Sequence, residues 1–127
     1  MNKIIIASVS LNGIIGRGGK TPWHSKSDLN HFRETTLDHP VVMGRRTFES
    51  IGNILDRRIN IVLSRDSDSP LNKYPGVVLC TSLDIAYDYC QKNNFAKIFI
   101  IGGAQIFNQT INDADEMIIS RINFFMA

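Results

Sequence analysis

One carboxylate in this chain stands where an acid could be tuned for proton transfer. Asp28 follows Pro22 and Trp23 at a predicted helix start. Leu29 is its neighbour, and Phe32 lies four residues after it, so the three side chains would share one face of a helix. Burial on an apolar surface raises the pKa of a carboxyl group. Such an acid beside an aromatic ring suits the binding and protonation of a flat, basic heterocycle.

The same aspartate also fits an ordinary structural role. Ser25 and Asp28 match the S-x-x-D capping box. A carboxylate in the first turn of a helix is common because it opposes the helix dipole. Taken alone, the segment favours the capping role, and the rest of the chain has to decide between the two interpretations.

Two apolar segments end in glycine directly before a predicted helix. Val41–Gly44 leads into Arg45, and Phe99–Gly103 leads into Ala104. Glycine lets a phosphate approach backbone N–H groups, and a helix N-terminus adds positive potential. Ligands of open α/β sheets bind at the carboxyl ends of strands, so both turns predict phosphate contacts. Taken singly, either turn more often has a purely structural role.

Three arginines could reach a phosphate at this edge of the sheet. Arg45 and Arg46 open one predicted helix, and Arg65 follows a strand that ends at Leu63 and Ser64. Arginine suits phosphate because its guanidinium binds through two N–H groups at once. The alternative role for each is solvated surface charge. The G-x-G-x-x-G and Walker A patterns do not occur in the sequence.

The elements that must position these residues alternate along the chain. Short apolar, β-branched runs alternate with amphipathic segments, which predicts an α/β fold whose strands are covered on both faces. The expected strands are Lys3–Val9, Pro40–Met43, Ile59–Leu63, Val77–Cys80, Lys97–Ile101 and Glu116–Ile122. The expected helices are 27–36, Arg45–Ile51, one that Ser82 caps with apolar positions from Leu83 to Cys90, and 104–112. Gly13–Lys20 is rich in glycine, which is typical of an active-site lid.

Composition narrows the class of protein. The 127 residues are 43% hydrophobic and 20% charged, which indicates one folded globular domain. A net charge of +2 is too small to indicate nucleic-acid binding, and the N-terminal apolar run is too short for a membrane span or signal peptide. A cytoplasmic location is therefore expected, with Cys80 and Cys90 as buried free thiols. His24, His31 and His39 lack metal-ligand spacing, so no metal is expected.

The segment Val41–Gly52 resembles the signature of the dihydrofolate reductase family, and further blocks follow in that family's order and spacing. They are Ile15-Gly16, Pro22-Trp23, Asp28-Leu29 with Phe32, Leu55 with Arg58, Asn60–Arg65 and Ile100–Phe107. The resemblance spans Ile4–Ile122 and implies a single domain with a central, mostly parallel sheet flanked by helices on both faces. It implies NADPH-dependent reduction of 7,8-dihydrofolate, with hydride transfer to C6 and protonation of N5. This reaction supports one-carbon and thymidylate metabolism and is an antifolate target.

On the substrate side, the resemblance implies three catalytic residues. Asp28 would anchor the pterin and promote N5 protonation, Trp23 would belong to the lid, and Ser120 takes the place of a threonine hydrogen-bonded to the acid. Arg58 would pair with the α-carboxylate of the glutamate tail, which suits a bidentate fork. The other implied substrate contacts are Ile6, Ala7, Leu29, Phe32, Ser50, Ile51, Leu55 and Ile101.

On the cofactor side, the resemblance implies that Thr47, Gly102 and Gly103 hold the pyrophosphate of NADPH. The adenosine 2′-phosphate would be surrounded by Arg45, Arg46, Ser64 and Arg65, which favours NADPH over NADH. The other implied cofactor contacts are Ser8, Ile15, Gly16, Gly44, Leu63, Ala104, Gln105, Ile106 and Phe107.

The sequence departs from the family at its end, because it stops soon after Ser120, where the family continues into an antiparallel hairpin of two more strands. We therefore expect a fold that lacks this hairpin, with Glu116–Ile122 at a sheet edge, weak stability and low activity as a lone monomer. The family is monomeric, and the bare edge would permit self-association here. Two alternatives remain: a non-catalytic homologue that binds nucleotide or folate, and a related pteridine or pyrimidine reductase. Arg58 argues against the second, because it has no evident task without a glutamate tail.

Overall fold

A single sheet of six parallel strands organises the described part of the chain, in the order β4-β3-β2-β5-β1-β6. The structure is a computed structural model that describes the backbone of residues 1–10, 26–65 and 74–122, and the side chains of 1–7, 30–65 and 74–119. Its elements are β1 (Asn2–Ser10), α1 (Lys26–Thr36), β2 (Pro40–Gly44), α2 (Arg45–Ile51), β3 (Ile59–Leu63), β4 (Val77–Cys80), α3 (Leu83–Lys92), β5 (Lys97–Gly102), α4 (Ala104–Thr110) and β6 (Glu116–Ile122).

The predicted elements are all present, and their bounds differ only at some ends. β2 and β5 each extend into the glycine that follows the apolar run, because Gly44 pairs with Leu63 and Gly102 pairs with Met43. α3 continues to Lys92, and the Ser82 side chain accepts a hydrogen bond from the N–H of Ile85, which confirms the predicted cap. α4 ends at Thr110, two residues earlier than expected.

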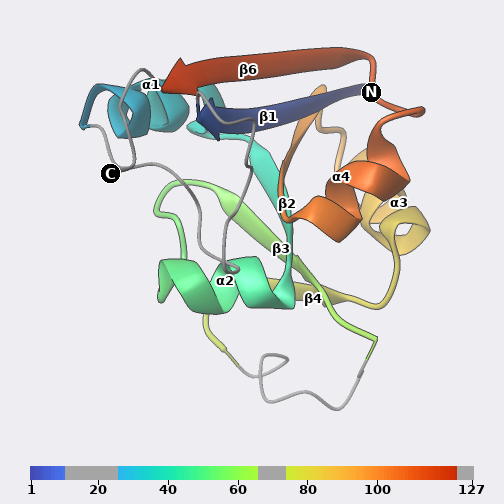
Figure 1. Ribbon diagram of the computed structural model, residues 1–127. Coiled ribbons are helices and arrows are strands. Elements are labelled where there is room, and N and C mark those ends of the chain that lie inside the picture. The colour runs from blue at the N-terminus through green and yellow to red at the C-terminus, as the bar shows by residue number, and fades with distance from the viewer. Residues whose placement is uncertain (11–25, 66–73, 123–127) are drawn as a thin grey trace.

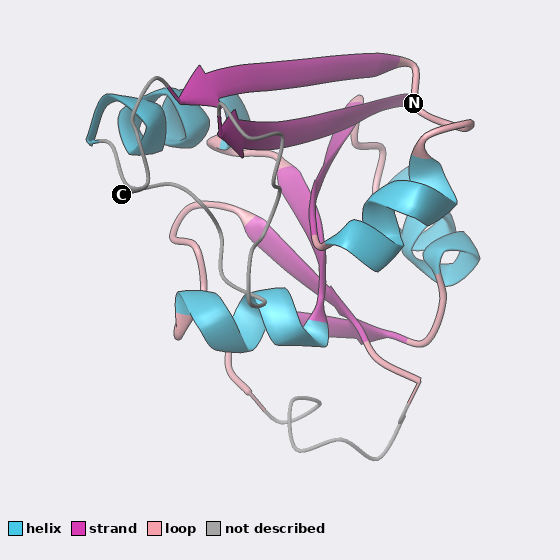
Figure 2. Cartoon of the chain, viewed as in Figure 1, coloured by secondary structure: helices cyan, strands magenta, loops and turns pink. Residues whose placement is uncertain are grey.

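Helices cover both faces of the sheet, as predicted (Figures 1 and 2). α1 and α2 pack on one face over a group of buried side chains that we call the α1/α2 core. Its members are Ile4, Ile6, Phe32, Val41, Met43, Phe48, Val62, Phe99 and Ile101. α3 and α4 pack on the other face, where α3 covers Val42, Ile61 and Ile98 and α4 covers Ile5 and Ile100. Alternate residues of one strand thus serve opposite faces, so the central strands are buried throughout.

The order of the strands brings two glycine turns together. The chain leaves β1, builds β2, β3 and β4 outward, and then returns to insert β5 between β2 and β1. The winding therefore reverses beside β5, and the carboxyl ends of β1, β5 and β2 lie next to one another. In open α/β sheets this switch point is where ligands bind.

Both cysteines are free and buried, as predicted. Cys80 on β4 and Cys90 on α3 belong to the same packed group between α3 and the sheet. Burial raises the pKa of the Cys90 thiol to about 11, with a further contribution from Cys80, so both thiols stay protonated at neutral pH. Among the described helices, none has the length and apolar character needed to span a membrane.

Candidate active site

The glycine turns after β2 and β5 face each other at the switch point. A Cβ atom at Gly44 would lie 3.5 Å from Cγ1 of Ile106 and 4.0 Å from the carbonyl oxygen of Gly102. Gly44 is the N-cap of α2, and Gly103 is the N-cap of α4. The paired turns expected from the sequence therefore lie at one edge, where Ile106 of α4 packs against Gly44.

Thr47 joins α2 to the second turn. Its side chain is buried, and its Oγ1 would lie 3.4 Å from a Cβ at Gly103 and 3.8 Å from one at Gly102. Gly102 has a φ of +132°, which side chains rarely adopt, and the Gly102-Gly103 peptide is cis. Glycine at these two positions keeps open a small space that the Thr47 hydroxyl borders.

The apolar residues assigned to the substrate come together beside this edge. Ile6 of β1, Phe32 of α1 and Ile101 of β5 are all in the α1/α2 core, with 3%, 6% and 2% of their surfaces exposed. Ile51 at the end of α2 and Leu55 in the following loop are half-buried and pack against the same core. Five separate elements and loops thus contribute to one apolar cluster.

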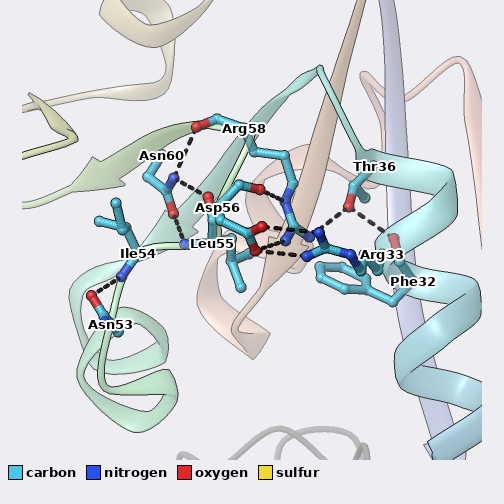
Figure 3. Close-up of polar contacts among 9 residues, drawn as sticks. All are labelled: Phe32, Arg33, Thr36, Asn53, Ile54, Leu55, Asp56, Arg58 and Asn60. Carbon is cyan, nitrogen blue, oxygen red and sulfur yellow. Dashed lines mark hydrogen bonds and ion pairs between the residues drawn. The ribbon is translucent and has the colours of Figure 1, made fainter.

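Arg58 is the buried cation of this region, and its contacts are drawn in Figure 3. Only 3% of its side chain is exposed. Its Nε donates to the Asp56 carbonyl at 2.9 Å, and its Nη1 donates to Thr36 Oγ1 at 3.1 Å. Its guanidinium carbon also lies 5.9 Å from the centre of the Phe32 ring, within cation–π range. Burial lowers the pKa of Arg58, while the neighbouring Asp56 carboxylate opposes that change.

Asp56 bridges Arg58 to a second arginine at the surface. Its carboxylate accepts from Arg33 Nη1 at 2.6 Å and Nη2 at 2.9 Å, which is the bidentate geometry that arginine favours. The other contact, from Arg58 Nη2 to Asp56 Oδ1, is longer, at 3.4 Å. The hydrogen bonds from Arg33 lower the pKa of Asp56 to about 2, so the carboxylate is ionised at neutral pH. We call these four residues, Arg33, Thr36, Asp56 and Arg58, the Arg58 network.

Asn60 fixes the loop that carries Asp56 and Arg58. It is buried in β3, and its Oδ1 accepts from the N–H of Leu55 at 2.8 Å. Its Nδ2 donates to the carbonyls of Leu55 at 2.9 Å and Arg58 at 3.1 Å. A single amide therefore closes the loop onto the strand, because a buried polar side chain must find hydrogen-bond partners.

The arginines assigned to a phosphate are all exposed. Arg45 pairs with Glu49 one helical turn later, at 3.4 Å, and its side chain is 53% exposed. Arg46 and Arg65 are also at the surface, while Leu63 and Ser64 are half-buried. The remaining assigned residues divide by burial: Ala7 is buried, Phe107 is half-buried, and Ser50, Ala104 and Gln105 are exposed.

Some predicted site residues lie outside the described part of the chain. Trp23, Ile15 and Gly16 fall in the range 11–25. For four others the backbone is placed but the side chain is not described: Ser8, Asp28, Leu29 and Ser120. Asp28 is in α1, one helical turn before Phe32. Ser8 and Ser120 are register partners on β1 and β6.

Sequence reasoning missed the partners of Arg58. No pattern in the sequence points to Arg33, Thr36 or Asp56, and Asn60 enters only within the block Asn60–Arg65. A signal was available for Asn60, which is the one polar residue of the strand Ile59–Leu63. Nothing comparable marks Arg33 or Asp56, because charged residues in a helix and a loop are usually solvated.

Comparison with known proteins gives one consistent answer. The family model for dihydrofolate reductase matches residues 3–126. The dihydrofolate reductase of Haemophilus influenzae is 40% identical over 118 residues, which cover 93% of this chain and 70% of that protein. Dihydrofolate reductase type 3 of Salmonella typhimurium is 40% identical over 119 residues, or 94% of this chain and 70% of that one.

A solved structure agrees with the sequence relatives. Dihydrofolate reductase from Enterococcus faecalis, complexed with NADP(H) and RAB-propyl, superposes with a TM-score of 0.87 and 31% sequence identity. The match covers 99% of this chain and 73% of that one. The chain therefore belongs to the dihydrofolate reductase family, whose members are NADPH-dependent oxidoreductases that reduce dihydrofolate.

Proposed function

We propose that this chain reduces 7,8-dihydrofolate to 5,6,7,8-tetrahydrofolate with NADPH at the carboxyl ends of β1, β5 and β2. One observation carries the placement: two consecutive residues of β5 belong to the two halves of the site. Ile101 lies in the α1/α2 core with Phe32, and Gly102 opens the glycine turn beside Thr47. A ligand in each half would meet at the end of this strand.

The pterin half is built from apolar side chains and one acid. Phe32, Ile51 and Leu55 would flank the ring and its aryl linker, with Ile6 and Ile101 closing the pocket; Ala7, Leu29 and Ser50 complete the assigned contacts. Asp28 would hold the 2-amino group and ring N–H of the pterin and assist protonation of N5. Trp23 of the lid and the Ser120 hydroxyl would support it. An apolar, water-poor surround is what keeps such a carboxyl partly protonated near neutral pH.

The nucleotide half fits the cofactor of the family. The space that Gly102 and Gly103 leave open beside Thr47 suits a pyrophosphate, because a side chain there would fill it. NADPH supplies the hydride when it is bound. Gly44 and Ile106 border this turn, and Ala104, Gln105 and Phe107 follow it on α4. Ser8, Ile15, Gly16 and Leu63 are the other proposed contacts, and Arg45, Arg46, Ser64 and Arg65 would receive the 2′-phosphate. The E. faecalis relative, of the same fold, was solved with NADP(H).

Arg58 gives the proposal its substrate class. The guanidinium is buried next to Phe32 and is held by Thr36 and the Asp56 backbone. A fixed, desolvated cation at the end of an apolar pocket suits a carboxylate carried on an aryl tail. We assign it to the α-carboxylate of the glutamate portion of dihydrofolate.

NADPH oxidation in the presence of dihydrofolate, followed with the purified chain, tests the proposed function. In Asp28→Asn we expect kcat at neutral pH to fall by about 10²- to 10⁴-fold, because a positioned proton donor contributes that much. The pH dependence of the residual rate should flatten. Glu34→Gln, on the exposed side of the same helix, is the matched control and should behave like the unaltered chain. Unchanged turnover in Asp28→Asn would show that the acid is assigned wrongly.

Two further properties complete the proposal. Free buried thiols at Cys80 and Cys90 support a cytoplasmic location, where thiols stay reduced.

β6 is the outer strand of the described sheet, and its Met117 and Ile119 are 46% and 51% exposed. These side chains support self-association with a second copy of the chain through β6, although the family is monomeric. Light scattering gives the molar mass in solution of the unaltered chain and of the double variant Met117→Lys/Ile119→Lys. Equal molar masses for the two proteins would contradict self-association through β6.

A further inference from the structure

Arg58 already has a carboxylate partner within its own chain. Of the three contacts its side chain makes in the Arg58 network, two hold it in place: the bond to the Asp56 carbonyl and the bond to Thr36. The third, from Nη2 to the Asp56 carboxylate, neutralises its charge. Since 3% of the Arg58 side chain is exposed, an incoming carboxylate must rearrange this network before it can make a bidentate contact.

The Asp56 carboxylate is the part of the network that can move. Its side chain is 64% exposed, and that of its second partner, Arg33, is 44% exposed. Its contact with Arg58, at 3.4 Å, is longer than either of its bonds to Arg33. Breaking this one long contact leaves Arg58 held by Thr36 and by the backbone, and Arg33 still neutralises Asp56. The guanidinium therefore keeps its position while its carboxylate partner changes.

We propose that Asp56 is a specificity-determining residue that competes with the glutamate carboxylate of dihydrofolate for Arg58. When the substrate takes the place of Asp56 at Arg58, Asp56 keeps its hydrogen bonds to Arg33. This inference rests on the proposed function, because it takes Arg58 as the site of the substrate's tail. It goes beyond that function because it assigns Arg33 and Asp56 a role in setting the affinity for the glutamate tail. The ionised Asp56 repels a second carboxylate at Arg58, so it lowers the affinity for ligands that carry the tail and leaves ligands without the tail unaffected.

Asp56→Asn tests the competition, since the amide keeps the shape and backbone of Asp56 and removes its charge. Dissociation constants are measured by quenching of intrinsic fluorescence, for dihydrofolate and for 7,8-dihydropterin, which has no tail. We expect dihydrofolate to bind about two- to fivefold more tightly to Asp56→Asn, which is the size of coupling typical of exposed charges. Binding of 7,8-dihydropterin should not change. Asp56→Ala should give the same gain, and thermal unfolding of each variant checks that it is folded.

Asp38→Asn is the matched control. Asp38 pairs with Arg57, the neighbour of Arg58, and the two aspartates are almost equally exposed, at 63% and 64%. Asp38 has a φ of +65°, a conformation that asparagine also tolerates, so the change adds no strain. Both variants alter the net charge equally. Dihydrofolate affinity should therefore stay unchanged in Asp38→Asn.

Three results would overturn the inference. They are unchanged or weaker dihydrofolate binding in the folded Asp56 variants, an equal gain for the ligand without a tail, or an equal gain in Asp38→Asn. If the unaltered chain reduces dihydrofolate but the Asp56 variants bind it no more tightly, this inference is overturned and the proposed function stands. Failure of the unaltered chain to bind dihydrofolate would overturn both.

Discussion

Glycine at the end of β5 is the residue on which the proposed nucleotide half of the site depends. Gly102 has a φ of +132°, and an added Cβ would lie 3.5 Å from the Phe107 ring and 3.8 Å from Thr47 Oγ1. In Gly102→Ala the methyl group both strains the backbone and enters the space assigned to the pyrophosphate. We expect a stability loss of about 1–3 kcal/mol and an NADPH dissociation constant raised by about tenfold.

Gly52→Ala is the control that separates backbone strain from filling of the space assigned to the pyrophosphate. Gly52 follows α2 with a φ of +87°, and a Cβ there would meet no atom within 4 Å. The two variants should lose stability to a similar extent in urea unfolding, but the NADPH affinity of Gly52→Ala should match that of the unaltered chain. Equal NADPH affinity in both variants would remove Gly102 from the cofactor site.

The limits of prediction from sequence are also clearest at the scale of residues. The glycine turns could be found because they are marked by residue type and spacing, whereas the apolar residues assigned to the pocket rest on the resemblance to the family. The Arg58 network could not be found, because its bonds join residues far apart in the chain: Thr36 and Arg58 are 22 positions apart, and Arg33 and Asp56 are 23 apart. Only the folded chain shows which of several exposed acids faces the buried arginine.

At the scale of elements, local pattern was enough to place every helix and strand of the described part. Alternation and β-branched runs marked the strands, and caps such as Ser82 marked helix starts. The C-terminal ends of β2 and β5 were less predictable, because Gly44 and Gly102 continue the pairing with the neighbouring strand. Backbone pairing there depends on the neighbouring strand, which is distant in sequence.

The packing of α3 contains a polar atom that has no hydrogen-bond partner among the described residues. The Tyr87 hydroxyl is buried and unpaired there, while its ring lies 4.3 Å from the Lys3 ammonium on β1. Tyr87→Phe keeps the ring and its contact with the cation and removes the hydroxyl. Because an unsatisfied buried group is destabilising, we expect the free energy of unfolding to rise by about 1 kcal/mol.

Tyr89→Phe on the same helix is the control for this packing prediction. Tyr89 is half-buried, and the same loss of a hydroxyl there should change stability by less than about 0.5 kcal/mol. Chemical denaturation of both variants gives the comparison. A loss of stability in Tyr87→Phe would show that its hydroxyl has a favourable interaction in solution.

At the scale of the whole molecule, the residues of the proposed substrate site and the residues packed under α3 lie on opposite faces of the sheet. The face with α1 and α2 holds the α1/α2 core and the Arg58 network, and the carboxyl edge holds the glycine turns. The face with α3 holds the two thiols and Tyr87, none of which belongs to the proposed site. Changes at these three side chains should therefore alter global stability without altering ligand affinity.

The buried thiol of Cys90 makes this global stability depend on alkaline pH. Burial disfavours the thiolate and raises the pKa of Cys90 from the ordinary value of 9.0 to about 11 in the folded chain. Between these values the unfolded state loses its proton first, so the stability present below about pH 9 falls as the pH rises towards 11. The change in pKa corresponds to about 3 kcal/mol. Urea unfolding of the unaltered chain under reducing conditions, set against Cys90→Ala, isolates this contribution from the other groups that titrate in the same range. The difference in stability between the two proteins should shrink by about 2 kcal/mol from pH 9 to 11, because the thiol is half-ionised at each end of this range in one of the two states. A constant difference would contradict the raised pKa.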